Sequence, residues 1–151
     1  LFRSLAARLA DRFAAVAAFS AAAGGVGGDR TGGKLYTTPG APVPFLIMHG
    51  TDDQVAPYDG GESPQFPGTI YISQQENVAI YSTAYGCAAK PETSTQQGRR
   101  GPLTTARFTG CGADLVAVRM EKVGHGWPDP DFAGFDGTSQ AWDFLKAHVR
   151  G

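Results

Sequence analysis

The chain has 151 residues, of which 42% are hydrophobic and 18% are charged, with a formal net charge of -1. This length suits one domain with a buried core. The near-neutral charge gives no electrostatic reason to expect nucleic acid or an anionic membrane as a partner, and no apolar run reaches the roughly 18 residues of a membrane span. We therefore expect a single domain over residues 1–151 that binds neither.

The first half of the chain predicts a helix, a strand, a long excursion and a second strand. Leucine and phenylalanine recur every four positions over 3–14, which predicts a helix; a signal peptide is the alternative for this region. A short apolar run over 14–20 suits a buried strand, and the Gly- and Pro-rich segment 21–44 suits a loop. Residues 45–49 (FLIMH) are continuously apolar, which indicates an interior parallel strand.

The second half of the chain predicts two helices and two strands. Thr138 or Ser139 is the expected N-cap of the last helix. The pattern as a whole indicates an α/β fold with a mostly parallel sheet. In order, the expected elements are a helix over 73–87, a polar loop over 88–102, strands over 103–110 and 114–123, and a helix over 138–149.

Two segments come near ligand-binding motifs without completing them. Residues 28–34 (GDRTGGK) approach a P-loop, but Leu35 stands where a magnesium-binding Ser or Thr is needed. Residues 129–137 are acidic, but an EF-hand counted from Asp129 would place Ala133 and Gln140 at ligand positions. We expect a flexible loop and a solvated turn, with no metal and no cofactor; a looser calcium loop remains the alternative.

A carboxylate and an imidazole follow two of the predicted strands. Asp52 and Asp53 come directly after 45–49, and His125 comes after 114–123, between Gly124 and Gly126. The carboxyl ends of parallel strands meet at one edge of a sheet, so these side chains can be neighbours. We expect Asp53 to orient His125 as a catalytic base, with the flanking glycines leaving room for substrate and an unusual backbone path.

The alternative to catalysis is structural. His125 would then be a turn residue and Asp53 a cap. We expect structural roles for the other two histidines, with His49 packing or hydrogen-bonding near the strand end and His148 complementing a helix dipole.

Four segments carry a family resemblance: HGTDDQVAPYDGG, VGHGWP, DGTSQAWDFLKAH and RLADRFAAVAAFSA. Together they resemble the C-terminal portion of the polyhydroxybutyrate depolymerase and feruloyl esterase (acetyl xylan esterase-like) group of α/β-hydrolases. The resemblance implies an α/β fold, the C-terminal part of an α/β-hydrolase fold, with a mostly parallel sheet and flanking helices. It also implies that the earlier strands and the nucleophile elbow lie upstream.

Carried over by position, the resemblance assigns roles to five residues. Asp53 matches the triad acid, His125 the general base, and Trp127 a residue lining the substrate pocket. Cys87 and Cys111 match a disulfide of the secreted members, which implies a secreted or periplasmic protein. Such a bridge would close a loop of about 25 residues and add roughly 3 kcal/mol.

The chain contains no Gly-x-Ser-x-Gly motif. Ser4, Ser20 and Ser139 do not fill its place, because each falls within or at the end of a predicted element without elbow glycines. The resemblance therefore implies a serine esterase or depolymerase whose serine lies upstream, acting on polyhydroxyalkanoate-type polyesters or on feruloyl or acetyl esters, with this chain inactive alone. The alternatives are a degenerate, non-catalytic binding module or partner subunit, and a calcium-dependent carbohydrate-binding module using Asp129 and Asp131.

Overall fold

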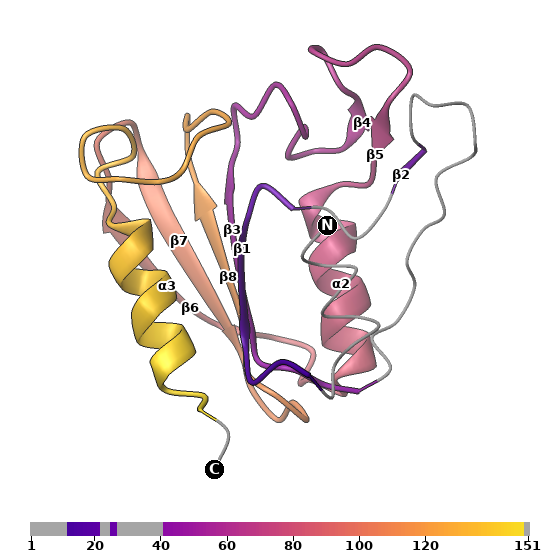
Figure 1. The fold of residues 1–151 in the computed structure, drawn as a ribbon, viewed down its shortest axis with the longest axis vertical. Coiled ribbons are helices and arrows are strands. Elements are labelled where there is room, and N and C mark those ends of the chain that lie inside the picture. Colours follow the sequence, from indigo (N-terminus) through magenta and orange to yellow (C-terminus); the bar gives the residue numbers. More distant parts are fainter. Residues whose placement is uncertain (1–11, 22–24, 27–40, 150–151) are drawn as a thin grey trace.

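A five-stranded sheet organises the part of the chain that the computed structural model describes, residues 12–21, 25–26 and 41–149 (Figure 1). The three strands β1, β3 and β8 are parallel, whereas β7 runs antiparallel to both of its neighbours, β8 and β6. In spatial order the strands are β1 (Val16–Phe19), β3 (Phe45–Gly50), β8 (Leu115–Met120), β7 (Pro102–Phe108) and β6 (Glu92–Gln97).

This architecture corrects the predicted fold class. The sheet is mixed, with two parallel and two antiparallel pairs, and the described residues contain only two α-helices, so the expectation of a mostly parallel, helix-flanked α/β-hydrolase sheet is wrong. One of the two antiparallel pairs comes from 88–102, which was expected to be a loop but contains β6, and the other joins the two predicted strands β7 and β8. Short connections join β6 to β7 and β7 to β8, and such connections allow only antiparallel pairing.

The two helices, α2 (Gln74–Ala84) and α3 (Gly137–Lys146), lie on opposite sides of the sheet (Figure 1). Each packs on its own apolar cluster, because successive residues of β3 point to opposite faces. Phe45 and Ile47 pack with Tyr81 of α2, while Leu46 and Met48 lie in the cluster that includes Ala141 of α3. All six residues of β3 are buried, as an interior parallel strand requires.

The caps of the two helices follow local side-chain chemistry. Ser73 and Glu76 form a capping box at the start of α2, in which each side chain bonds the other residue's backbone N–H. At the start of α3, Asp136 is the N-cap and accepts a hydrogen bond from the backbone N–H of Ser139. The predicted cap at Thr138 or Ser139 is therefore wrong by two or three residues. Trp142 of α3 is exposed, whereas Phe144 packs against the apolar cluster on this face of the sheet.

A second, three-stranded sheet lies beyond the start of α2 (Figure 1). It pairs β5 (Ile70–Tyr71) in antiparallel fashion with β2 (Gly25–Val26) on one side and β4 (Gly61–Glu62) on the other. The 21–44 excursion thus contributes one short strand. The predicted helix over 3–14, apart from its last residues, lies outside the described residues, as do the 28–34 segment and Ser4.

A disulfide joins Cys87, just after α2, to Cys111, in the connection that precedes β8. The pairing that the resemblance implied is therefore present. Backbone hydrogen bonds flank the bridge, from Gly112 to Tyr85 at 2.7 Å and from Ala88 to Thr109 at 2.8 Å. No helix in the described part of the chain is long and apolar enough to cross a membrane.

Candidate functional site

The side chains of Asp53 and His125 meet past the carboxyl ends of β3 and β8. Nδ1 of His125 lies 2.9 Å from Oδ2 and 3.1 Å from Oδ1 of the carboxylate, although the two residues are 72 positions apart. The Asp53 side chain is fully buried, whereas 41% of the His125 side chain is exposed. A buried acid thus holds one ring nitrogen and leaves Nε2 available as a proton acceptor.

The loop after β3 fixes Asp53 through its own backbone. Oδ1 accepts hydrogen bonds from the N–H groups of Val55 and Ala56, both at 2.8 Å, so the carboxylate closes a tight turn around itself. Its neighbour Asp52 is exposed. Of the two adjacent carboxylates, only Asp53 contacts His125.

Hydrogen bonds also tie the acid loop to the start of the histidine loop. The backbone N–H of Thr51 donates to Met120 at 2.9 Å, and that of Asp52 donates to Val123 at 3.0 Å. In return, the N–H of Lys122 donates to the Thr51 hydroxyl at 2.8 Å. Because β3 and β8 are paired neighbours, the two loops leave the sheet together and these bonds hold them in register.

The environment of Asp53 favours its ionised form. Burial alone would raise the pKa of this carboxyl, but hydrogen bonds from His49, Ala56 and His125 outweigh burial and hold the pKa well below its usual range. The nearby Ser20 hydroxyl lowers the pKa as well, although its Oγ satisfies no hydrogen-bond geometry with any described group. Asp53 therefore stays charged at neutral pH beside His125.

A second imidazole contacts the same carboxylate from inside the protein. His49, at 1% exposure, places Nε2 3.3 Å from Oδ2 of Asp53 and 2.9 Å from the carbonyl oxygen of Ala56. Its Nδ1 lies 3.2 Å from Oε1 of Gln74 on α2. The sequence suggested loop hydrogen bonding for His49 but did not suggest its contact with the acid. The available signal was the four-residue spacing between His49 and Asp53.

The loop that carries His125 is supported by packing from a distant hairpin. Phe132 packs against Gly126, where an added Cβ would come within 3.2 Å of the ring. Arg100, in the β6–β7 turn, stacks on the Phe132 ring at 4.9 Å from its centroid and donates to the Phe132 carbonyl oxygen at 2.9 Å. Neither glycine beside His125 adopts a positive φ, so the unusual backbone path expected there is absent.

Aromatic side chains form one wall beside the histidine. Phe19, the last residue of β1, lies 6.1 Å from the His125 ring and 6.3 Å from the Trp127 ring, measured between centroids. Trp127 is 48% exposed and is anchored by a 2.8 Å hydrogen bond from Nε1 to the Thr138 hydroxyl. The sequence pointed to Trp127 but missed Phe19, because a strand-end aromatic is also an ordinary core residue.

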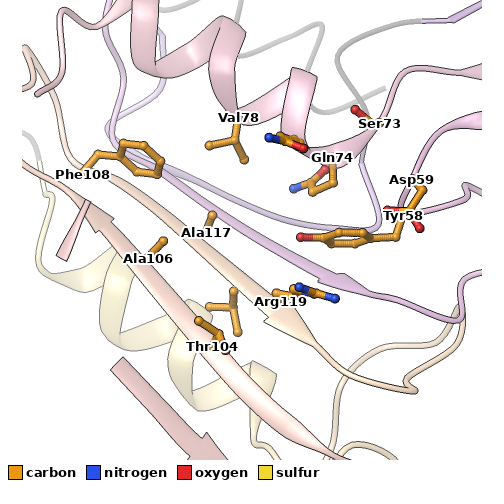
Figure 2. A pocket seen from close by; sticks show the side chains of 12 residues that line it. Tyr58, Asp59, Ser73, Gln74, Val78, Thr104, Ala106, Phe108, Ala117 and Arg119 are labelled. Carbon is orange, nitrogen blue, oxygen red and sulfur yellow. The ribbon is translucent and has the colours of Figure 1, made fainter. Parts of the chain in front are cut away.

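Two cavities lie on the sheet, one on each face, and neither is lined by Asp53, His125 or Trp127. The larger, of about 540 Å³, opens between α2 and the β7–β8 pair (Figure 2). Its walls include Gln74, Tyr58 and Arg119, with the guanidinium over the tyrosine ring at 5.4 Å from its centroid. This cavity borders the His49 side of the acid loop, and the exposed face of His125 opens to solvent elsewhere.

The remaining candidates occupy structural positions. His148 hydrogen-bonds the Phe144 carbonyl oxygen at 2.7 Å and the Asp114 carboxylate at 2.9 Å. Asp129 caps a turn by accepting from the N–H of Phe132 at 2.7 Å. Among the described residues, no group of three or more His, Cys, Asp or Glu side chains is placed to hold a metal ion.

No hydroxyl or thiol in the described ranges hydrogen-bonds Nε2 of His125. Ser20 follows the last residue of β1, has a positive φ of 47° and is buried on the Asp53 side of the site. The Ser139 hydroxyl is engaged with Asp136 at 2.6 Å in the α3 cap. The described part of the chain therefore presents an acid and a base but no nucleophile hydrogen-bonded to Nε2 of the base.

Comparison with known proteins does not identify a family. A scan against protein-family models finds none that matches this chain, and a search of curated proteins finds no match either. The resemblance to the depolymerase and esterase group therefore stays a prediction that depends on the motifs around Asp53 and His125.

Proposed function

We propose that this chain supplies the acid and the base of a Ser-His-Asp hydrolytic site that cleaves carboxylic esters. The observation that supports the proposal is the buried Asp53 carboxylate at 2.9 Å from Nδ1 of a His125 ring whose side chain is 41% exposed. An acid that orients one ring nitrogen and frees the other is the arrangement by which a histidine activates a serine.

In the proposed reaction, Nε2 of His125 removes the proton of a serine hydroxyl as its oxygen attacks the ester carbonyl. The same nitrogen then protonates the leaving alcohol, and water completes the cycle by hydrolysing the acyl-serine. Asp53 keeps the imidazole in the tautomer that has Nε2 free, and its charge stabilises the imidazolium. The serine is proposed to lie upstream of Leu1, as the motif resemblance implies.

The proposed substrates are polyhydroxyalkanoate-type polyesters or feruloyl and acetyl esters. The exposed Trp127 and the neighbouring Phe19 provide an apolar wall beside the base, which suits an acyl or aromatic group. The Cys87–Cys111 disulfide is consistent with an oxidising compartment, and we propose a secreted or periplasmic location.

A fluorophosphonate probe tests the proposal on the protein together with its upstream sequence. We expect one serine to be labelled, with the labelling lost in His125→Asn and strongly reduced in Asp53→Asn. The matched controls are His148→Asn and Asp52→Asn, which should label at the rate of the unmodified protein. Absence of labelling, or labelling indifferent to His125, would reject the esterase and favour a non-catalytic binding module.

A further inference from the structure

His49 is a buried ionisable residue that contacts Asp53 in addition to His125, the partner of Asp53 in the proposed acid–base pair. It is the penultimate residue of β3, is 1% exposed and lies on the face of the sheet that α2 covers. A buried imidazole must satisfy both ring nitrogens, and the groups facing them determine which nitrogens carry hydrogen. Whether each facing atom is a donor or an acceptor follows from the side-chain amides of Asn77 and Gln74, starting at the backbone carbonyl of Ala21.

The Ala21 carbonyl oxygen fixes the orientation of Asn77, because a carbonyl only accepts hydrogen bonds. Nδ2 of Asn77 lies 2.9 Å from this oxygen and 3.0 Å from Oε1 of Gln74, so one NH₂ group serves both acceptors. Exchanging the oxygen and nitrogen of Asn77 would place two oxygens against each other at Ala21. The side-chain oxygen of Gln74 must therefore face Asn77.

The same Gln74 oxygen lies 3.2 Å from Nδ1 of His49, so Nδ1 faces an acceptor and has to donate. On the other side of the ring, Nε2 faces two further acceptors, the Ala56 carbonyl oxygen at 2.9 Å and Oδ2 of Asp53 at 3.3 Å. A neutral imidazole carries only one N–H and would leave one of these sides without a donor.

The other charged and titratable groups near His49 do not change this assignment. Tyr58 packs its ring on His49 edge to face, with centroids 5.4 Å apart. Arg119 on the neighbouring β8 lies over the Tyr58 ring and pairs with Glu121 at 2.7 Å. Asp53 is thus the anion in direct contact with the His49 ring among the described residues.

We propose that His49 is held as an imidazolium that shares the Asp53 carboxylate with His125, and that it acts as a positioning residue for the acid. Its charge would offset much of the Asp53 charge before His125 takes a proton. His125 would then stay neutral, and ready to accept a proton from a nucleophile, at a lower pH than beside an unshared carboxylate. This consequence for catalysis rests on the proposed function, whereas the charge of His49 does not.

Nitrogen-15 NMR of the histidine rings tests the proposal on the chain itself, without substrate or nucleophile. The chain has three histidines, so the ring signals can be assigned with His125→Asn and His148→Asn. We expect both ring nitrogens of His49 to show the shifts of a protonated imidazolium at pH 7. A neutral ring with hydrogen on Nε2 alone would overturn the proposal, whatever the outcome of serine labelling.

Two variants test how the charge arises and what it does. Asn77→Ala frees Gln74 to turn its NH₂ group toward Nδ1, and we expect His49 to become neutral at pH 7. An unchanged imidazolium would refute the amide chain as the cause.

His49→Gln keeps a donor toward Ala56 but removes the charge. We expect the pH at which the His125 signals titrate to rise by about one unit, whereas the exposed neighbour change Gln75→Ala should leave it in place. No rise in His49→Gln would refute the sharing of Asp53.

Discussion

The carboxylate of Asp53 reaches His125 across the gap between two neighbouring parallel strands, with Nδ1 at 2.9 Å from Oδ2. Asp53 is held by hydrogen bonds from the backbone of its own turn, whereas the loop that carries His125 is supported by the contact between Phe132 and Arg100. The consequences of this arrangement for stability and chemistry can be measured separately.

Replacing Asp53 by Asn should lower the free energy of unfolding by about 3 kcal/mol, because it removes the charged partner of two imidazoles from a buried position. Urea denaturation of the chain measures this change. Asp52→Asn is the matched control, since Asp52 is adjacent and exposed, and it should shift the value by no more than about 0.5 kcal/mol. Equal effects of the two substitutions would contradict a special role for Asp53.

The lowered pKa of Asp53 should appear in the acid limb of the stability profile. Burial opposes the shift, but hydrogen bonds, foremost that from His49, hold the pKa below the unfolded value of 3.8. The unfolded state then binds the proton more tightly, so this contribution is complete above about pH 4 and declines as the pH falls further. Denaturation at a series of pH values should show that the free energy of unfolding falls less steeply below about pH 4 in Asp53→Asn than in the unmodified chain. An unchanged slope would contradict the lowered pKa of Asp53.

His125→Asn should separate chemistry from folding. In the protein with its upstream sequence, we expect kcat for ester hydrolysis to fall by several orders of magnitude, because the general base is lost. The melting temperature should move little, since the His125 side chain is 41% exposed. His148→Asn serves as the control for activity, and near-normal hydrolysis by His125→Asn would refute the proposed base.

Removing the disulfide by Cys87→Ala with Cys111→Ala should lower the free energy of unfolding by about 3 kcal/mol, from the loop-closure entropy of the 24-residue separation. The bridge lies before the start of β8, whereas the dyad lies past its end. Histidine ring NMR signals in the folded double variant should therefore match those of the oxidised chain. Altered His125 signals would show that the two ends of the sheet are coupled.

Gly50 should tolerate no side chain, since a Cβ there would lie 2.1 Å from the carbonyl oxygen of Val123, at the start of the histidine loop. We expect Gly50→Ala to destabilise the fold by about 1–3 kcal/mol and to disturb His125. Gly124→Ala is the matched control, because its Cβ would meet only ordinary contacts at 3.8 Å and beyond. Both effects can be read from thermal unfolding and the His125 ring signals.

Continuous or alternating hydrophobicity was enough to predict four of the five strands of the main sheet. Residues 45–49 are apolar because β3 is covered on both faces; 103–110 covers β7 apart from Pro102, and 114–123 contains β8. β6 gave no such signal: ETSTQQ is exposed along its whole length, so neither face needs apolar side chains. The predicted sheet was mostly parallel because β6 was missed and because the short β7–β8 connection, which requires an antiparallel pair, was not taken into account.

For the candidate site too, the sequence predicted some of the contacts and not others. Strand-end placement predicted that Asp53 and His125 could be neighbours, and the structure brings them together. The contacts of Ser20 and Phe19 depend on which side chains cross from one element to another, which spacing along the chain does not report. Only the alternation that places His49 on the same face as Ile47 hinted at its partner in α2.

The all-polar, uncovered edge at β6 bears on how the molecule meets other chains. Its outer row of backbone N–H and C=O groups is open to a further strand, and after Glu92 the strand carries neither charge nor proline to discourage one. At high protein concentration, edge-to-edge self-association should therefore begin at residues 92–97, and a lysine introduced at Thr95 should raise solubility while leaving the distant acid–base pair intact.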